Sequence, residues 1–263
     1  MESDKHNGIT VVILCGGMGT RLAEYTEVRP KPLVEVGGKP LLWHIMKHYS
    51  RYGFNEFILA LGYKGEQIKQ YFLDFYSLSQ DFTVSLTDGK IQTINNDDCE
   101  PWKVHLIDTG LATMTGGRLK LLSSLINEQI FLMTYGDGVS DVDLSALLKF
   151  HQDNNALVTL TAVRPPARFG ALEFTGNAIH QFKEKSIIHE GWINGGFFVI
   201  NKQALAYIKD DVMWEQSPME NLAVDGQLNG YRHEGFWQCV DTARDLKYLG
   251  ELWEKGQAPW KTW

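Results

Sequence analysis

The feature that most constrains the fold lies at residues 9–32, where the apolar run ITVVILC passes directly into GGMGTRL and, a little later, into PKP. A short apolar run of this kind is typical of a buried strand. In an open α/β sheet, ligands bind beyond the carboxyl ends of the strands, and glycines there let backbone N–H groups approach a polyphosphate. The pattern therefore predicts a phosphate-binding loop immediately after the first strand.

This loop differs from two familiar phosphate-binding motifs. It has no GxxxxGK(S/T) sequence, and Leu22 stands where a dinucleotide-binding loop needs its third glycine. What it does contain is two cations, Arg21 and Lys31, with Pro30 and Pro32 stiffening the backbone around the lysine. The combination suits a triphosphate, whereas a plain turn with solvated cations would leave it unexplained.

Strand-like and helix-like segments alternate along most of the chain, which predicts an α/β fold: a Rossmann-like, mostly parallel mixed sheet flanked by helices. We expect residues 1–8 to be a flexible extension and 9–263 a single domain. Asp88-Gly89 predicts a small antiparallel flap near 82–96. The expected strands are 9–15, 57–61, 82–86, 104–107, 130–133, 157–163, 171–174, 178–182, 195–201 and 235–240, and the expected helices are 39–52, 66–75, 119–126, 144–151, 204–208, 219–224 and 242–255.

The amino-acid composition limits the kinds of partner that this chain can bind. The formal net charge of −7 argues against a nucleic-acid or anionic-membrane partner, because both require a dense positive surface. No run approaches the roughly 18 apolar residues of a membrane span, and the polar start MESDKHNG is unlike a signal sequence, so we expect a cytoplasmic protein. The three cysteines form no CxxC pair and are expected to be reduced, small buried side chains rather than catalytic thiols.

Two aspartates follow predicted strands and are candidate metal ligands. Asp137 lies in YGDG after the strand near 130–133, and Asp241 follows the last strand. A triphosphate is strongly anionic, so two carboxylates beside it make sense only with a divalent cation between them, and Mg²⁺ prefers oxygen ligands. Asp241-Thr242 also fits an ordinary helix N-cap region, so both interpretations stay open at that position.

The sequence DVD at 141–143 suggests a different class of protein. A DxD motif near a strand end is typical of the metal site of glycosyltransferases that consume nucleotide sugars. The simpler interpretation is acidic residues before a helix, where the helix dipole favours them. A glycosyltransferase has no need for GGxGTRL together with PKP, and this feature discriminates between the two classes.

Histidines and tryptophans offer two further candidate sites. His44 and His48 are spaced as a metal pair on a predicted helix, but no HExxH glutamate or third ligand accompanies them, so packed or surface histidines are favoured. Trp253, Trp260 and Trp263 could form a base-stacking platform. On an acidic protein, core packing or a subunit interface is the better interpretation.

Long stretches of the chain resemble the sugar-1-phosphate nucleotidyltransferases, which join a nucleoside triphosphate to a sugar phosphate and release pyrophosphate. The first is GGMGTRLAEYTEVRPKPLVEVGGKPLLWH, and it is followed by DTG, MTGGRL, YGDG, RFGALE, FKEK, INGGFFV, GFWQCVDTARD and LWEKGQAPWKTW. The resemblance covers nearly the entire chain after the first eight residues.

The resemblance implies roles for particular residues. Arg21, Lys31 and Asp137 would be catalytic, with Mg²⁺ held by Asp137 and Asp241. Contacts to the nucleotide are implied for Leu14, Gly16, Gly17, Gly19, Thr20, Arg21, Lys31, Thr113, Arg118 and Gly136. Contacts to the sugar phosphate are implied for Gly170, Glu184, Lys185 and Asn194.

The base and the sugar are also implied by resemblance. The chain has DTGLATMTGGRL where thymidylyl-transferring members have a QPxGLAQA-like segment, and Thr113 and Arg118 match nucleotide contacts of members that use CTP and glucose 1-phosphate. Thymidylyl or uridylyl transfer and a non-catalytic nucleotide-sugar sensor are the alternatives. The acceptor that would recognise the cytosine amine could be a backbone carbonyl, which no sequence displays. The resemblance also implies a homo-oligomer, with a hexamer as the expected assembly. If the cytidylyl interpretation holds, it further implies that the product CDP-glucose feeds the synthesis of dideoxy sugars for surface polysaccharide.

Overall fold

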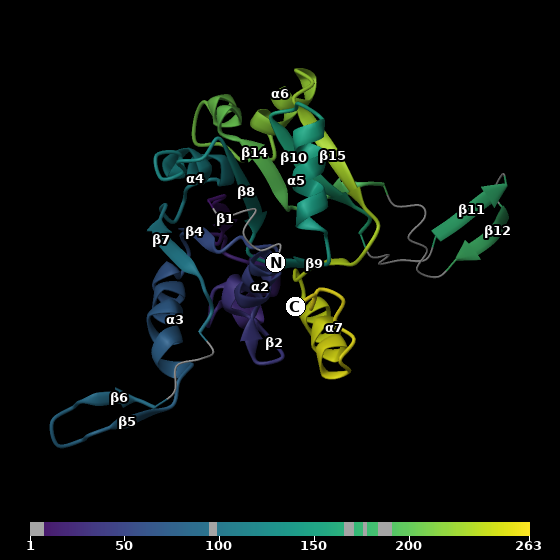
Figure 1. Ribbon diagram of the computed structural model, residues 1–263. Coiled ribbons are helices and arrows are strands. Elements are labelled where there is room, and N and C mark those ends of the chain that lie inside the picture. The colour runs from purple at the N-terminus through teal and green to yellow at the C-terminus, as the bar shows by residue number, and fades with distance from the viewer. Residues whose placement is uncertain (1–7, 95–98, 166–170, 176–177, 184–190) are drawn as a thin grey trace.

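The computed structural model describes residues 8–94, 99–165, 171–175, 178–183 and 191–263, and its centre is a mixed eight-stranded sheet (Figure 1). The strand order is β13-β10-β14-β8-β1-β4-β7, and β15 pairs with β10. Strands β1, β4, β7 and β8 run parallel, as do β10 and β15, while β14 is antiparallel to β8 and β10. These strands are β1 Val11–Leu14, β4 Glu56–Leu61, β7 Lys103–Asp108, β8 Ile130–Tyr135, β10 Val158–Val163, β13 Ile193–Asn194, β14 Phe198–Asn201 and β15 Leu228–His233.

The first strand is apolar on both sides because helices cover both faces of the sheet. Val11 and Ile13 pack into one core, and Val12 and Leu14 into the other, as the alternation of side chains along a strand requires. Helices α2, α3, α5 and α7 contribute to the first core, and α4, α6 and the 3₁₀ segment η4 to the second. The predicted α/β class is confirmed.

The helices lie close to their predicted positions in most cases. Their bounds are α1 Ala23–Thr26, α2 Leu41–Arg51, α3 Gly65–Leu78, α4 Thr115–Leu122, α5 Leu144–Asp153, α6 Ser217–Val224 and α7 Ala243–Glu254, with 3₁₀ segments η1 Thr20–Leu22, η2 Lys31–Leu33 and η4 Lys202–Tyr207. None of the described helices is both long and apolar enough to cross a membrane.

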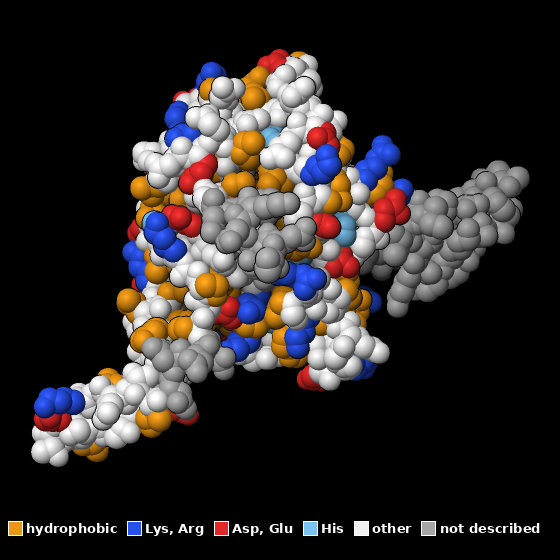
Figure 2. Space-filling model, in the orientation of Figure 1, with side chains coloured by type: hydrophobic (Ala, Val, Ile, Leu, Met, Phe, Trp, Pro, Cys, Tyr) orange, Lys and Arg blue, Asp and Glu red, His pale blue; other side chains and the backbone are white. Residues whose placement is uncertain are grey.

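In the described part of the chain, four two-stranded ladders lie outside the main sheet. They are β2 Glu35–Val36 with β3 Lys39–Pro40, β5 Phe82–Val84 with β6 Ile91–Thr93, β9 Gly138–Ser140 with β16 Trp237–Cys239, and β11 Ala171–Thr175 with β12 Ala178–Lys183. The β5–β6 hairpin is the predicted flap, and it projects from the body beyond α3 (Figures 1 and 2). Leu86, Ile91 and Ile94 on this hairpin are 61–94% exposed.

The structure corrects two sequence predictions and adds a strand. No element was predicted for residues 228–233, which form β15, a partly buried strand whose sequence LNGYRH carries no apolar run. The helix expected at 119–126 spans Thr115–Leu122 instead. The segment expected to be helical at 204–208 is the 3₁₀ segment η4, which begins at Lys202.

Candidate active site

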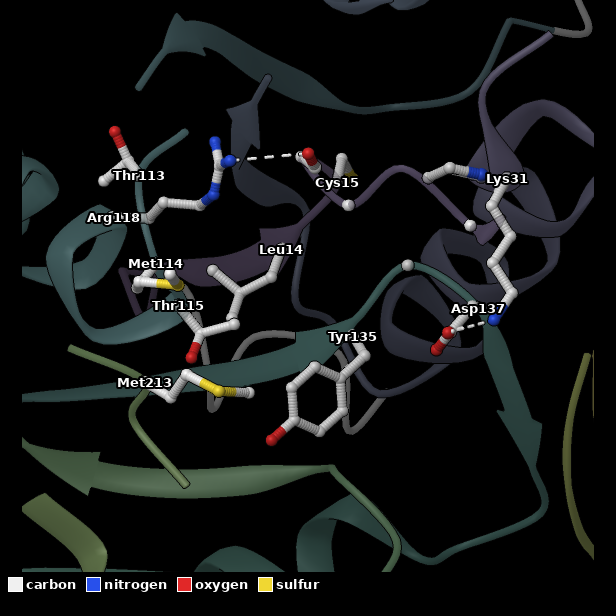
Figure 3. A pocket seen from close by; sticks show the side chains of 15 residues that line it. Leu14, Cys15, Lys31, Thr113, Met114, Thr115, Arg118, Tyr135, Asp137 and Met213 are labelled. Carbon is white, nitrogen blue, oxygen red and sulfur yellow. Dashed lines mark hydrogen bonds and ion pairs between the residues drawn. The ribbon is translucent and has the colours of Figure 1, made fainter. Parts of the chain in front are cut away.

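A pocket of about 270 Å³ opens at the carboxyl ends of β1 and β8 (Figure 3). The segments that line it are the glycine-rich loop, the start of η2, the start of α4, the end of β8 and Met213. Residues that were predicted to bind nucleotide or metal make up much of the wall, and these are Leu14, Gly16, Gly17, Gly19, Lys31, Thr113, Arg118, Gly136 and Asp137. Cys15, Pro32, Met114, Thr115 and Tyr135 complete the lining together with Met213.

The glycines of the loop are required by two different constraints. Gly19 has φ 62°, a left-handed conformation that favours glycine, and its carbonyl accepts a hydrogen bond from Thr26 Oγ1 at 3.1 Å. At Gly16, a Cβ atom would lie 2.2 Å from Cζ of Arg118. Gly16 is therefore needed because a buried guanidinium lies against its backbone.

Arg118 is built into the wall of the pocket. It is 4% exposed, and its guanidinium donates to Thr109 Oγ1 at 2.6 Å, to the Leu61 carbonyl at 2.8 Å, and to the carbonyls of Gly16 and Leu111 at 3.4 Å each. Figure 3 shows the Arg118 side chain in the pocket wall. The acceptors belong to the end of β4, the glycine-rich loop and the loop after β7. Arg118 thus holds the glycine-rich loop against the loop before α4. A nucleotide in the pocket would lie beside this guanidinium.

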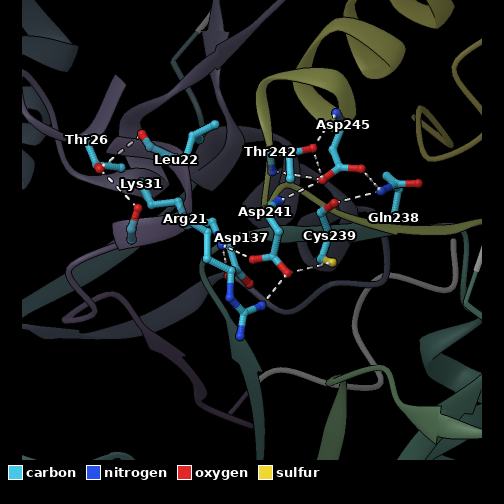
Figure 4. Close-up of polar contacts among 11 residues, drawn as sticks. Arg21, Leu22, Thr26, Lys31, Asp137, Gln238, Cys239, Asp241, Thr242 and Asp245 are labelled. Atoms are coloured by element: carbon cyan, nitrogen blue, oxygen red, sulfur yellow. Dashed lines mark hydrogen bonds and ion pairs between the residues drawn. The ribbon is translucent and has the colours of Figure 1, made fainter. Parts of the chain in front are cut away.

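The charged residues meet at the other end of the pocket (Figure 4). Lys31 Nζ lies 2.7 Å from Asp137 Oδ2 and 2.8 Å from Asp241 Oδ1, and Arg21 Nη1 lies 3.0 Å from Asp241 Oδ2. The two aspartates are 106 and 210 residues from Lys31 in the sequence. The predicted convergence of these four residues at one sheet edge is found in the structure.

Opposite charges dominate the electrostatics of this cluster. Burial alone would lower the pKa of Lys31, but the charges and hydrogen bonds of Asp137 and Asp241 more than offset burial, and the pKa is raised. For Asp241, burial acts to raise the pKa, yet Lys31 and then Arg21 lower it below its ordinary value. Both groups therefore stay ionised at neutral pH.

The helix cap beside Asp241 explains how its carboxylate is aimed. Thr242 is the N-cap of α7 and forms a capping box with Asp245, whose carboxylate also accepts the backbone N–H of Asp241 at 3.1 Å. The capping role expected near this position therefore falls to Thr242. Asp241 itself is left free to point at Lys31, so the two interpretations of the sequence are compatible.

The carboxylates of Asp137 and Asp241 fit a divalent cation. Both lie within hydrogen-bonding distance of a single ammonium group, so one cation already contacts the pair. Across the described part of the chain, no cluster of three or more His, Cys, Asp or Glu could hold a metal. A magnesium ion at this position would thus have two carboxylates from the protein, and it commonly completes its shell with phosphate oxygens and water.

Some predicted site residues lie elsewhere. Thr20 lies in η1 and is not part of the pocket wall, and the Arg21 side chain is 77% exposed. Asn194 lies on β13, where its amide nitrogen is 3.2 Å from the Tyr135 hydroxyl. Gly170, Glu184 and Lys185 fall outside the described residues, so their predicted contacts to sugar phosphate stay predictions.

The acidic pair 141–143 has a structural explanation. Asp143 is the N-cap of α5 and accepts the Ala146 N–H at 2.9 Å, while Asp141 accepts hydrogen bonds from His233 Nε2 at 2.8 Å and from the Phe236 N–H at 2.7 Å. Asp143 therefore caps the helix that follows it, as the simpler interpretation expected, whereas Asp141 binds the segment that precedes β16.

The structure confirms the interpretation of the histidines as packed side chains, and it confirms burial for one of the three cysteines, while Cys239 is half-buried. His44 and His48 are 1% and 2% exposed, and each donates Nε2–H to a backbone carbonyl at 2.9 Å. Cys15 is buried, and burial, followed by the nearby Asp137 charge, raises the pKa of its thiol. Cys15 therefore contributes a neutral side chain to the pocket. Cys99, however, is exposed.

The loop at 211–215 was not anticipated from the sequence. It packs against the first turn of α4, where Asp211 Oδ1 accepts the Met114 N–H and the Val212 carbonyl accepts the Gly116 N–H, both at 2.9 Å. A Cβ on Gly116 or Gly117 would lie 2.6 Å or less from this loop. The two glycines in the first turn of α4 are thus explained by a partner loop nearly 100 residues away.

The fold and this edge define the class of protein: an α/β protein with a glycine-rich loop and a lysine–aspartate cluster at the carboxyl ends of the strands, which is where such sheets bind their ligands. Residues 10–225 match the family model described as nucleotidyl transferase. Because the match spans most of the chain, the protein belongs to the nucleotidyl transferase family. The resemblance inferred from the motifs is confirmed.

Curated relatives make the relationship more specific. The glucose-1-phosphate cytidylyltransferase of Salmonella typhimurium strain LT2 is 49% identical over 254 residues, which cover 96% of this chain and 98% of that one. A probable glucose-1-phosphate cytidylyltransferase of Bacillus subtilis strain 168 is 44% identical over the same share of this chain and 99% of its own. A mannose-1-phosphate guanyltransferase of Hypocrea jecorina is more distant, at 28% identity over 93% of this chain and 65% of its own length.

Solved structures confirm the fold. HddC from Yersinia pseudotuberculosis in complex with GMP-PN superposes with a TM-score of 0.67 over 93% of this chain and 99% of that one, at 21% identity. The inositol-1-phosphate CTP transferase from T. maritima gives a TM-score of 0.65 over 97% and 98% of the two chains, at 15% identity.

Proposed function

We propose that this protein transfers a cytidylyl group from CTP to glucose 1-phosphate, forming CDP-glucose and pyrophosphate. The observation that carries the proposal is the 49% identity, across almost the full length of both chains, to a protein named glucose-1-phosphate cytidylyltransferase. The lysine–aspartate cluster beside the glycine-rich loop supports a catalytic role, because a sensor that only bound the product would not need it.

The chemistry asks for positioning and charge neutralisation. A phosphate oxygen of glucose 1-phosphate attacks the α-phosphorus of CTP, and the bond from that phosphorus to the oxygen bridging the β-phosphate breaks, releasing pyrophosphate. The attacking group is already an anion, so no protein base is required. Catalysis then comes from holding the reactants in line and from stabilising negative charge on the departing pyrophosphate.

The residues of this chain divide the work. The glycine-rich loop would offer backbone N–H groups to the triphosphate, with Arg118 keeping the loop in place. Lys31 and Arg21 would neutralise charge on the triphosphate and the leaving pyrophosphate. Of these cations, Lys31 is the better placed, because its side chain is 12% exposed and lies inside the pocket, whereas Arg21 extends from the rim.

We also propose that the enzyme works with Mg²⁺ held by Asp137 and Asp241. When bound, such an ion supplies Lewis-acid polarisation of phosphate oxygens. Lys31 contacts both carboxylates directly. We therefore expect the lysine to shift toward the phosphates when nucleotide and metal enter together, so that the aspartates exchange one cation for another.

A second copy of the chain is the partner that the surface supports. The projecting β5–β6 hairpin and the adjoining face of α3 carry exposed apolar side chains, including Leu73 and Leu78, which are 70% and 75% exposed. Such a patch is typical of an interaction surface. We propose a homo-oligomer, and a hexamer is the assembly that sedimentation equilibrium should test. Cytoplasmic location and supply of CDP-glucose to dideoxy-sugar synthesis stay predictions from the sequence.

The first experiment measures pyrophosphate release with Mg²⁺ and glucose 1-phosphate, offering CTP, dTTP, UTP, ATP and GTP in parallel. Release with CTP far above the others, lost in Asp137→Asn, is the expected result. Release with dTTP or UTP would retain the mechanism and overturn the base assignment. No release with any nucleotide, combined with binding of CDP-glucose, would favour the sensor.

A further inference from the structure

Glu215, in the loop between η4 and α6, accepts hydrogen bonds from two hydroxyl groups of the pocket wall. Tyr135 OH lies 2.5 Å from its Oε1, and Thr115 Oγ1 lies 2.6 Å from its Oε2. An ionised carboxylate can only accept, so both hydroxyls must donate to it. Each oxygen of Glu215 thus fixes the direction of one hydroxyl proton.

Thr115 connects Glu215 to the nucleotide side of the pocket. It is the first residue of α4, two residues after Thr113, and its hydroxyl also accepts the Trp214 N–H at 2.8 Å. Thr115, Thr113 and Arg118 all line the same pocket. A displacement of Thr115 would therefore move the wall against which the nucleotide is proposed to bind.

Tyr135 connects Glu215 to the other side. It is the last residue of β8, two residues before Asp137, and its oxygen accepts a hydrogen bond from Asn194 Nδ2 at 3.2 Å. The Asn194 Oδ1 in turn accepts the Gly196 N–H at 2.9 Å. The amide is thereby oriented, with one N–H and one oxygen lone pair left over for a sugar hydroxyl.

The polarity of this chain of hydrogen bonds depends on the negative charge. Because Tyr135 must donate to Glu215, its lone pairs face Asn194, and only the amide nitrogen of Asn194 can point toward it. Burial, followed by the Glu215 charge, raises the pKa of Tyr135, so the phenol keeps the proton that it donates. A neutral amide at position 215 could present either an oxygen or an N–H₂ group, and the direction would be lost.

Glu215 is not needed to hold its loop in place. Trp214 is fully buried in the core, and the backbone contacts of Met114 with Asp211 and of Gly116 with Val212 fasten the loop to α4. The two hydroxyl contacts of Glu215 therefore add orientation to a loop that is already anchored.

We infer that Glu215 is a positioning residue with two hydrogen-bonded arms. One arm is Thr115, on the side of the pocket where the nucleotide is proposed to bind, and the other is Tyr135–Asn194, on the side proposed for the sugar. The inference rests on the proposed function, because Asn194 is the predicted contact for a sugar hydroxyl. Glu215 touches neither substrate and acts through the groups that it orients.

If each arm orients one substrate, a variant in one arm should change the KM for that substrate more than the KM for the other. A residue with a merely structural role would change both KM values together. Steady-state KM for CTP and for glucose 1-phosphate should be measured in the wild type, Tyr135→Phe, Thr115→Val and Glu215→Gln. We expect Tyr135→Phe to raise the KM for glucose 1-phosphate about tenfold, the size of one hydrogen bond to a charged acceptor. Thr115→Val should chiefly raise the KM for CTP, and Glu215→Gln should raise both.

Controls separate this inference from the proposed function. Glu220→Gln changes an exposed glutamate of α6 and should leave both KM values unchanged. If the wild type turns over with another nucleotide, the base assignment fails and the same KM values are measured with that nucleotide. If it turns over with none, calorimetric Kd values for CTP and glucose 1-phosphate replace the KM values.

The inference is overturned if folded Glu215→Gln binds both substrates as the wild type does. It is equally overturned if variants in the two arms change both KM values alike, and every variant loses activity only in proportion to its loss of thermal stability. Should Glu215→Gln fail to fold, Tyr135→Phe and Thr115→Val still test the inference, because each removes a single hydroxyl at nearly constant shape. The first should raise the KM for glucose 1-phosphate and the second the KM for CTP.

Discussion

Two regions of the molecule confine ionisable side chains, and they do so in opposite ways. The catalytic edge, formed by Arg21, Lys31, Asp137 and Asp241, keeps its charges and pairs them. The aromatic cluster, formed by His44 with Trp253 and Trp260 and by His48 of the same helix α2 with Tyr52 and Phe197, keeps its imidazoles neutral, and both have pKa values lowered to about 4. Helix α7 joins the regions, since Asp241 precedes its start and Trp253 lies in its last turn.

The local surroundings explain the difference. In the aromatic cluster, burial is the largest cause of the low histidine pKa values. His44 also uses both ring nitrogens as a neutral imidazole, donating Nε2–H to the Val36 carbonyl and accepting the Trp260 Nε1–H at Nδ1. A second ring proton would face the indole N–H. At the catalytic edge, by contrast, each charge lies beside an opposite charge and partly faces solvent.

The comparison shows that the two regions differ in whether their ionisable side chains stay charged. The same fold neutralises titratable groups in its core, where a charge would be costly, and retains them at the sheet edge, where an anionic substrate and a metal are proposed to bind. Four predictions test this contrast, from the largest expected effect to the smallest.

Removing the central cation should have the largest effect. Lys31→Met takes away the ammonium that neutralises the proposed leaving group, and kcat should fall by about 10²–10³-fold, as for loss of one preorganised charge-stabilising group. Pyrophosphate release at saturating substrate measures it. Lys39→Met, which changes an exposed lysine 5.6 Å from the Trp43 ring centroid, is the matched control. Retention of kcat in Lys31→Met would contradict the role of the catalytic edge.

Acid should act on the aromatic cluster. The folded state keeps His44 and His48 neutral down to about pH 4, whereas an unfolded histidine takes up a proton near pH 6.5. The unfolded state thus binds more protons between these values, and stability is lost as the pH falls through this window. The loss should reach about 3 kcal/mol for each histidine.

Urea unfolding at a series of pH values measures this loss. In His48→Gln, the slope of unfolding free energy between pH 6.5 and 4 should be smaller than in the wild type, because one buried histidine with a lowered pKa is removed while His44 and His151 remain. A wild-type stability that is flat across this range would show that the cluster does not exclude protons.

Metal binding without nucleotide sharpens the comparison at the catalytic edge. In the free protein Lys31 contacts both carboxylates, so an added cation must compete with it. Lys31→Met should therefore bind Mn²⁺ about tenfold more tightly than the wild type in the absence of nucleotide, a modest coupling between charged sites. Paramagnetic resonance of free Mn²⁺ measures this independently of activity. Weaker binding in the variant would mean that the lysine and the metal do not compete.

The smallest effect should come from the link between the regions. Thr242→Ala removes the N-cap of α7, and the free energy of unfolding should fall by about 1 kcal/mol. The melting temperature would drop by about 2 °C in a chain of this size. Because the Asp241 backbone is tied to the same cap, we expect kcat to fall in Thr242→Ala but not in Thr262→Ala, near the far end of the chain.

Short-range patterns in the sequence determined much of this protein. The apolar run before GGMG, the Asp88-Gly89 turn and the start of α7 near Thr242 all depend on hydrogen bonds and periodicity within a few residues, so a short window contains the necessary information. Arg21, Lys31, Asp137 and Asp241 could be named in advance because each directly follows or precedes such an element. The parallel order of β1 and β8 brings the glycine-rich loop and Asp137 to one edge, whereas Asp241 reaches that edge through the antiparallel pairing of β16 with β9.

Other contacts of the protein depend on long-range packing and could not be predicted from short stretches of sequence. The contact of Glu215 with Thr115 and Tyr135, the cap that the 211–215 loop supplies to α4, and the pairing of β15 with β10 all join segments about 70 to 100 residues apart. No local pattern marks them, because a half-buried polar strand and a loop glutamate are indistinguishable in sequence from solvated segments. Their roles arise from which surfaces the sheet order brings together, and that order is set by the packing of the whole chain.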